Sequence, residues 1–256
     1  MHFAVVARIL GVLLMLFSML ANLPSILVSF LYGDGEVSSF WTSAMITFAT
    51  GFILWLVTLR SKKELRTRDG FLVVTLFWTV LSTFGALPFL FSLDVRLSVT
   101  DAIFESFSGL TTTGATVITG LDVLPKSILF YRAQLQWLGG MGIVALAVAV
   151  LPMLGIGGMQ LYRAESPGPV KNDNLVPRLA ETAKALWYIY LGLTVTCALA
   201  YWAAGMNLFD AICHSFTTVA IGGFSNYDAS IGYFDSNIVN LIAVAFMFLA
   251  GINFAL

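Results

Sequence analysis

Two short runs of small residues and glycine are the part of this chain best suited to chemistry. They have the sequences TTTG at residues 111–114 and AIGG at residues 220–223. Small side chains and glycine allow backbone carbonyls to turn toward a common axis, where a stack of oxygens can replace the hydration shell of a monovalent cation. The residues expected to bind an ion in this way, through their backbone and without a coordinating side chain, are Thr111, Thr112, Thr113, Gly114, Ala220, Ile221, Gly222 and Gly223.

Both runs belong to longer segments that align without a gap at an offset of 109. Residues 101–116 have the sequence DAIFESFSGLTTTGAT and residues 210–225 the sequence DAICHSFTTVAIGGFS. The identical pairs are Asp101/Asp210, Ala102/Ala211, Ile103/Ile212, Ser106/Ser215, Phe107/Phe216 and Gly114/Gly223. Either glycine run alone could simply end a helix with a turn. Recurrence in the same context favours a shared role, and internal symmetry of this kind is typical of transport proteins.

A short helix is expected to position each run, over residues 98–110 and 207–219. Ser98 and Asn207 are good N-caps, and each is followed three positions later by an aspartate that favours the positive end of a helix. About a dozen residues cannot cross a bilayer. We therefore expect these helices to enter and return on one side, which leaves non-helical backbone at membrane depth that must line water or be buried in protein.

Composition indicates a membrane protein. Hydrophobic residues make up 59% of the chain and charged residues 11%, against roughly 45–50% and about 25% in soluble domains. A spanning helix needs about 20 apolar residues. Runs of that kind are expected at residues 9–31, 40–59, 71–92, 133–162, 185–209 and 236–256.

Basic residues predict the orientation. Ten of the thirteen fall on one side of these spans, at Arg8 and in the loops around residues 60–68 and 163–184. The positive-inside bias then places the amino terminus in the cytoplasm and both glycine runs toward the outside. Nine acids share that outer side, where they are expected to concentrate cations. They are Asp34, Glu36, Asp94, Asp101, Glu105, Asp122, Asp210, Asp228 and Asp235.

The spans divide the chain into three parts and predict an all-α membrane protein. Residues 1–59 form a helical hairpin, and residues 60–158 and 159–256 form two pseudo-repeats. Each repeat contains an outward helix, a short pore helix, an extended filter strand and an inward helix. Ser166-Pro167-Gly168-Pro169 is expected to break the chain between them with a cytoplasmic turn.

Several function classes are disfavoured. A net charge of −1 argues against a nucleic-acid partner, and the basic loops are explained by topology and by anionic membrane lipid. No catalytic residues and no cofactor are expected, because no nucleophile with a base and no metal-ligand spacing occurs within the spans. His214, which replaces Glu105 in the second segment, is expected to make a satisfied polar contact near the outer mouth.

At residues 101–116 and 210–225 the chain resembles the TrkH-like membrane subunits of the Trk, Ktr and HKT superfamily of potassium transporters. The hairpin at 1–59 and the Gly139-Gly140-Met141-Gly142 run add to the resemblance. It implies potassium uptake across the bacterial inner membrane through a channel-like pore, with potassium held by filter carbonyls and a characteristic glycine at Gly114 and Gly223. It also implies a homodimer gated by a cytosolic nucleotide-binding subunit of the TrkA type.

The resemblance also implies four filters around one pore, whereas this sequence supplies two before Leu256. We therefore expect a fragment that lacks the second half and its gating loop. The alternative function is symport of a cation with sodium or protons, for which acids at the membrane midplane would be typical. The six predicted spans contain none.

Overall fold

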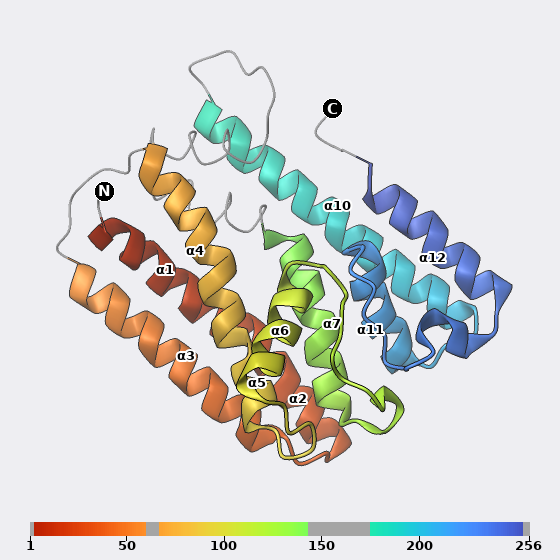
Figure 1. Cartoon of the computed structure of the whole chain (residues 1–256). Coiled ribbons are helices and arrows are strands. Elements are labelled where there is room, and N and C mark those ends of the chain that lie inside the picture. Colours follow the sequence, from red (N-terminus) through yellow and green to blue (C-terminus); the bar gives the residue numbers. More distant parts are fainter. Residues whose placement is uncertain (1–2, 60–66, 143–174, 253–256) are drawn as a thin grey trace.

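The computed structural model describes residues 3–59, 67–142 and 175–252, and within them the regular structure is entirely helical. Long helices lie side by side, with two short ones, α6 and α11, among them (Figure 1). The elements are α1 (Phe3–Phe17), the π-helix η1 (Ser18–Asn22), α2 (Leu23–Tyr32), α3 (Val37–Thr58), α4 (Thr67–Gly85), α5 (Leu87–Phe91), α6 (Val99–Leu110), the 3₁₀ turn η2 (Leu121–Val123), α7 (Lys126–Gly140), α10 (Leu175–Ala203), α11 (Leu208–Val219), the 3₁₀ turn η4 (Ser230–Phe234) and α12 (Asn237–Ala250).

Four stretches are long and apolar enough to cross a membrane: Phe3–Tyr32, Val37–Thr58, Asp69–Phe91 and Lys184–Ala203. They confirm four of the predicted spans. The span predicted at 133–162 begins within α7, but its part beyond residue 142 lies outside the described residues, as does the turn predicted at 166–169. The span predicted at 236–256 corresponds to α12, an apolar helix of 14 residues, and residues 253–256 lie outside the description.

The first hairpin packs closely because of two glycines. A side chain on Gly11 of α1 would place its Cβ 2.6 Å from the carbonyl oxygen of Gly51 on α3. Small residues at facing positions let membrane helices approach in this way. Ser18 in η1 adds a hydrogen bond to the Ala44 carbonyl of α3 at 2.8 Å.

The same hairpin contacts α7 at two points. Pro24 has no N–H to donate to the Leu20 carbonyl four residues earlier, and this carbonyl instead accepts a hydrogen bond from Gln134 Nε2 at 2.6 Å. At the other end, the Asp34 carboxylate accepts from the N–H of Ser127 at 2.9 Å. Because Pro125 precedes α7 and has no capping side chain, Asp34 caps this helix from a distant part of the chain.

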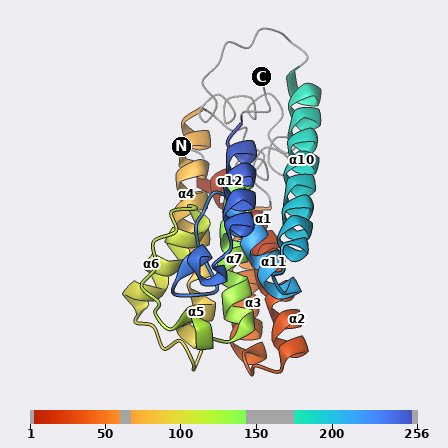
Figure 2. The same ribbon diagram turned by 90° about the vertical axis from the view of Figure 1, so that its right-hand side faces the viewer.

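The two halves after the hairpin pack alike. α4 lies on α6 and α6 on α7, just as α10 lies on α11 and α11 on α12. In addition α11 packs against α7, so that α7 lies between the two short helices in both views (Figures 1 and 2). A single helix can therefore contact the backbone that comes directly after each of the short ones.

Candidate functional site

The two short helices begin with the same cap. Ser98 Oγ accepts a hydrogen bond from the Asp101 N–H at 3.2 Å, and Asn207 Oδ1 accepts from the Asp210 N–H at 2.9 Å. These caps confirm the predicted starts of both helices. The cap therefore fixes the residue at which each helix begins, and the carboxyl end of each helix is followed directly by a glycine run.

The backbone at the ends of the two helices is also the same. Three backbone hydrogen bonds from N–H to carbonyl recur at the offset of 109, all between 2.8 and 3.1 Å. After α6 they are Thr111 to Phe107, Thr112 to Gly109 and Thr113 to Ser108. After α11 the corresponding bonds are Ala220 to Phe216, Ile221 to Thr218 and Gly222 to Thr217. After these turns the chain is irregular over residues 113–120 and 222–225. The predicted extended segments therefore begin with turns at residues 111–112 and 220–221 that bond back to the helix ends, and the backbone after these turns is irregular.

Both glycine runs contain two residues with positive φ at matching positions. The angles are 54° at Thr112 and at Ile221, 77° at Gly114 and 86° at Gly223. A positive φ is uncommon outside glycine and rare for a β-branched residue. The same backbone conformation thus occurs in both runs. In each run the first residue with positive φ is β-branched, and the second is glycine.

The structure brings the two groups of predicted residues together. The side of Gly114 that would carry a Cβ faces the carbonyl oxygen of Gly222, closer than a side chain could tolerate, whereas no atom lies within 4 Å of the corresponding point on Gly223. The hydroxyl of Thr111 bonds to the Phe107 carbonyl and to the Thr113 hydroxyl, at 2.7 and 2.8 Å. Because these hydroxyls are engaged locally, the backbone carbonyls are the better candidates for binding an ion.

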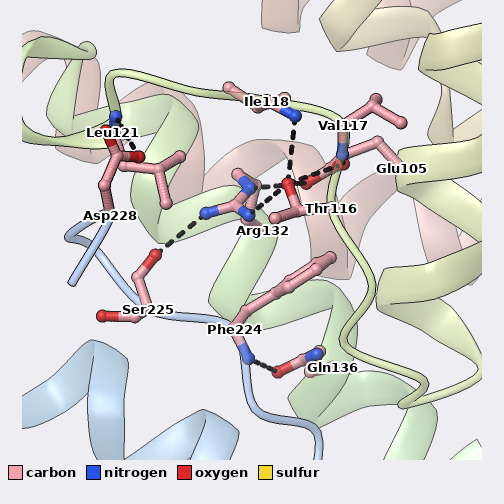
Figure 3. A network of polar contacts seen from close by, with 10 residues as sticks. All are labelled: Glu105, Thr116, Val117, Ile118, Leu121, Arg132, Gln136, Phe224, Ser225 and Asp228. Carbon is pink, nitrogen blue, oxygen red and sulfur yellow. Dashed lines mark hydrogen bonds and ion pairs between the residues drawn. The ribbon is translucent and has the colours of Figure 1, made fainter. Parts of the chain in front are cut away.

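A buried ion pair lies beside the runs (Figure 3). Arg132 Nε of α7 lies 2.8 Å from Glu105 Oε1 of α6, and the two side chains are 1% and 0% exposed. The Glu105 carboxylate also accepts from the Thr116 hydroxyl at 2.9 Å and from the Val117 N–H at 3.1 Å. Glu105 therefore holds the backbone that follows the first run.

Arg132 also reaches the second run. Its Nη1 donates to the carbonyl of Ser225 at 2.9 Å, and its Nη2 donates to the Thr116 hydroxyl at 3.1 Å. The guanidinium lies over the Phe224 ring, 4.3 Å from the ring centroid. One side chain on α7 thus contacts both segments just after their glycines.

Gln136, one turn further along α7, contacts the second glycine run and the residue that follows it. Its Oε1 accepts the N–H of Phe224 at 3.0 Å (Figure 3). Its amide also fills the place where Gly222 would carry a side chain. A larger residue at position 222 would therefore displace Gln136 or the backbone that it holds.

His214 occupies the place in α11 that Glu105 has in α6. Its Nδ1 lies 2.9 Å from the Asp210 carbonyl and its Nε2 lies 3.0 Å from Ser225 Oγ. The Nδ1 nitrogen is the donor, because a carbonyl can only accept. The predicted polar contact is confirmed, and it matches the Glu105 contact with Thr116, the residue aligned with Ser225.

The backbone outside the glycine runs is held by acids that accept hydrogen bonds. Asp228 accepts from the N–H groups of Gly120 and Leu121 at 2.8 and 3.1 Å. Asp210 accepts from the hydroxyl of Tyr227 at 2.6 Å. Desolvation raises the pKa of Tyr227, and so does its hydrogen bond with Asp210, so this hydroxyl remains a donor at neutral pH.

Three of the acids expected to concentrate cations on the outer face are instead buried. Glu36, Glu105 and Asp210 are 3%, 0% and 0% exposed. Each accepts hydrogen bonds from neighbouring residues, Glu36 from the Ser92 hydroxyl. These three carboxylates therefore act as local hydrogen-bond acceptors within the protein, while their expected place on the outer side stays a prediction.

Sequence reasoning missed Arg132 and Gln136. The available signal was two long polar side chains four residues apart on one helix, at the start of an otherwise apolar run. In a membrane helix such residues usually face protein or water. Their partners, however, lie near residues 116 and 224, and no local pattern connects these positions to α7.

Comparisons with known proteins agree with the resemblance found in the sequence. A family model described as TrkH, cation transport protein, matches residues 37–256. The chain is 62% identical to the Trk system potassium uptake protein TrkH of Halomonas elongata and 58% identical to that of Escherichia coli K12, over all of this chain and 53% of each relative. The crystal structure of the potassium transporter TrkH from Vibrio parahaemolyticus matches with a TM-score of 0.85 and 56% identity, over 100% of this chain and 51% of that one. The chain therefore spans about half the length of the relatives that it matches.

Proposed function

Because the chain belongs to the TrkH family of cation transport proteins, we propose that it forms part of a potassium uptake pathway in the bacterial inner membrane. In this proposal residues 111–114 and 220–223 line a channel-like pore. The observation that carries it is the repeated backbone: two short helices end in the same turn with the same pair of positive φ angles. Relatives named as potassium uptake proteins make potassium the ion of choice.

The chemistry follows from the carbonyls and the helix ends. The backbone oxygens of Thr111, Thr112, Thr113, Ala220, Ile221 and Gly222 would replace water around a dehydrated potassium ion, and Gly114 and Gly223 would permit the required backbone. The carboxyl ends of α6 and α11 carry partial negative charge, which favours a cation at the start of each glycine run. No side chain has to change its protonation state during passage.

The organisation proposed here is the one expected from the sequence. Residues 1–59 form a supporting hairpin, and residues 60–158 and 159–256 form two pore repeats in which α6 and α11 are the pore helices. Four glycine-bearing segments would surround the ion. Two further segments would come from residues outside 1–256 or from another chain.

Two further parts of the proposal rest on the resemblance alone. They are a homodimer and gating by a cytosolic nucleotide-binding subunit of the TrkA type. The proposed cytoplasmic amino terminus rests instead on the distribution of the basic residues. The basic loops near residues 60–69 and 155–184 would face that subunit, and most of both lies outside the described residues.

Symport with sodium or protons is the second candidate. It would need an acid free to bind the coupling ion near the pathway. Glu105, a buried acid on the helix that precedes the first glycine run, is already paired with Arg132 at 2.8 Å, which favours a channel-like mechanism.

The test is transport by the complete protein in liposomes. We expect rubidium uptake driven by an outward potassium gradient, with competition by external potassium and little by sodium, and with no need for a sodium or proton gradient. A strict requirement for either gradient would replace the channel-like proposal with symport. Absence of potassium or rubidium flux from folded protein, with its regulatory subunit present, would contradict the proposed function itself.

A further inference from the structure

Arg132 links the two glycine-bearing segments through three different nitrogens. Nε bonds to Glu105 on α6, Nη2 to Thr116 after the first glycine run, and Nη1 to the carbonyl of Ser225 after the second glycine run (Figure 3). Hydrogen bonds from an ionised donor are shorter and stronger than neutral ones. The guanidinium is also planar and rigid, so the directions to its three partners are fixed relative to one another.

The hydrogen bonds of Arg132 to Glu105 and to Ser225 have different roles. Its contact with Glu105 balances two charges that are almost completely buried, and removal of either partner would leave the other uncompensated. The contact with Ser225 is not needed for charge balance, because that partner is a neutral carbonyl. The hydrogen bond to Ser225 instead connects α7, and through Thr116 the backbone after the first glycine run, to the backbone after the second glycine run.

A second contact from α7 adjoins this connection. Gln136 holds the N–H of Phe224, the residue before Ser225, and Gly222 lies against Gly114. The second segment is therefore located by α7 at consecutive residues.

We propose that Arg132 is a positioning residue that sets the separation of the two glycine-bearing segments and thereby the preference of the pore for potassium over sodium. The inference rests on the proposed function, since it assumes that these segments line the pore. Selectivity in a carbonyl-lined site depends on the geometry and number of its oxygens. Without the hydrogen bond from Arg132 to Ser225, the second glycine run would move closer to a bound sodium ion, and the pore would discriminate less between potassium and sodium.

The experiment compares four variants of the complete protein in liposomes and in detergent. Arg132→Lys keeps a positive charge beside Glu105, but its single nitrogen cannot occupy the three positions from which Nε, Nη1 and Nη2 of Arg132 donate. Arg132→Gln leaves Glu105 unpaired, and the double variant Glu105→Gln with Arg132→Gln removes both charges together. Arg96→Gln is the matched control, because Arg96 is exposed and its Nε donates to the Leu93 carbonyl. Permeability ratios and thermal unfolding midpoints are measured for each.

We expect Arg132→Lys to fold and to lose about tenfold in the potassium to sodium permeability ratio, the effect of losing one charge-assisted hydrogen bond. Arg132→Gln should unfold at a lower temperature than the wild type. The double variant should recover the unfolding midpoint without recovering the ratio, and Arg96→Gln should match the wild type in both.

The inference is wrong if Arg132→Lys keeps the wild-type ratio, or if stability and selectivity recover together in the double variant. Either result would make Arg132 a structural residue only. If Arg132→Gln does not fold, Arg132→Lys and the double variant still test whether Arg132 affects the potassium to sodium permeability ratio. Failure of the wild type to conduct potassium would be a separate result, directed against the proposed function.

Discussion

Gly114 and Gly223 have the same backbone conformation but different surroundings. Replacement of either by alanine forces a side chain into a left-handed conformation, at a cost of about 1–2 kcal/mol. At Gly114 the new Cβ would also collide with the Gly222 carbonyl, whereas at Gly223 it would meet no atom within 4 Å. The two positions should therefore respond unequally.

We predict that Gly114→Ala reduces the potassium to sodium permeability ratio and the unfolding midpoint more than Gly223→Ala does. Both variants are measured in the complete protein, by competition of potassium and sodium with rubidium uptake and by thermal unfolding. A larger effect at Gly223 would contradict the described contact. Unchanged ratios in both variants would remove these glycines from the ion pathway.

At the scale of elements, the end of α7 packs against the ends of both short helices. The Cβ side of Gly139 faces the carbonyl of Leu110, the last residue of α6, and that of Gly140 faces Ala220, which follows α11, at 3.1 Å. Two adjacent glycines thus let one helix contact the start of both runs. The sequence showed the Gly-Gly pair, but only the fold shows what it approaches.

We predict that Gly139→Ala lowers the unfolding midpoint and rubidium uptake, because a methyl group there must displace the end of α6. Gly192→Ala is the control, since Gly192 lies within α10 with no atom within 4 Å of its Cβ position. Alanine is favoured over glycine in a helix by about 1 kcal/mol, so the control should be neutral or slightly stabilised. Equal behaviour of the two variants would show that the close approach at Gly139 is not needed.

The elements also show what could and could not be predicted from sequence. The starts of α6 and α11 follow from Ser98 and Asn207, because a cap is a local interaction within three residues. The contact between Arg132 and Ser225 joins residues 93 apart, and it depends on how α7 packs between two short helices. The burial of Glu105 in an ion pair could not be predicted for the same reason, because its partner Arg132 is on another helix.

At the scale of the whole molecule, the basic residues predict that the two ends of the long helices face opposite sides of the membrane. We predict that single cysteines at Ser61 and Ser230 are labelled from opposite sides of intact cells, with Ser230 outside, by a reagent that does not cross the membrane. The native thiols of Cys197 and Cys213 are buried, so the unmodified protein is the control and should show little labelling. Labelling of both new cysteines from one side would show that the number of spans between them is wrong.

The Arg132 link also bears on how the two related segments could diverge. Arg132 recognises the first segment through side chains, Glu105 and Thr116, but the second through the main-chain oxygen of Ser225. A main-chain oxygen is present whatever residue occupies the position. A change of side chain at position 225 would therefore leave this hydrogen bond in place, whereas a change at Glu105 or Thr116 would remove a partner of Arg132.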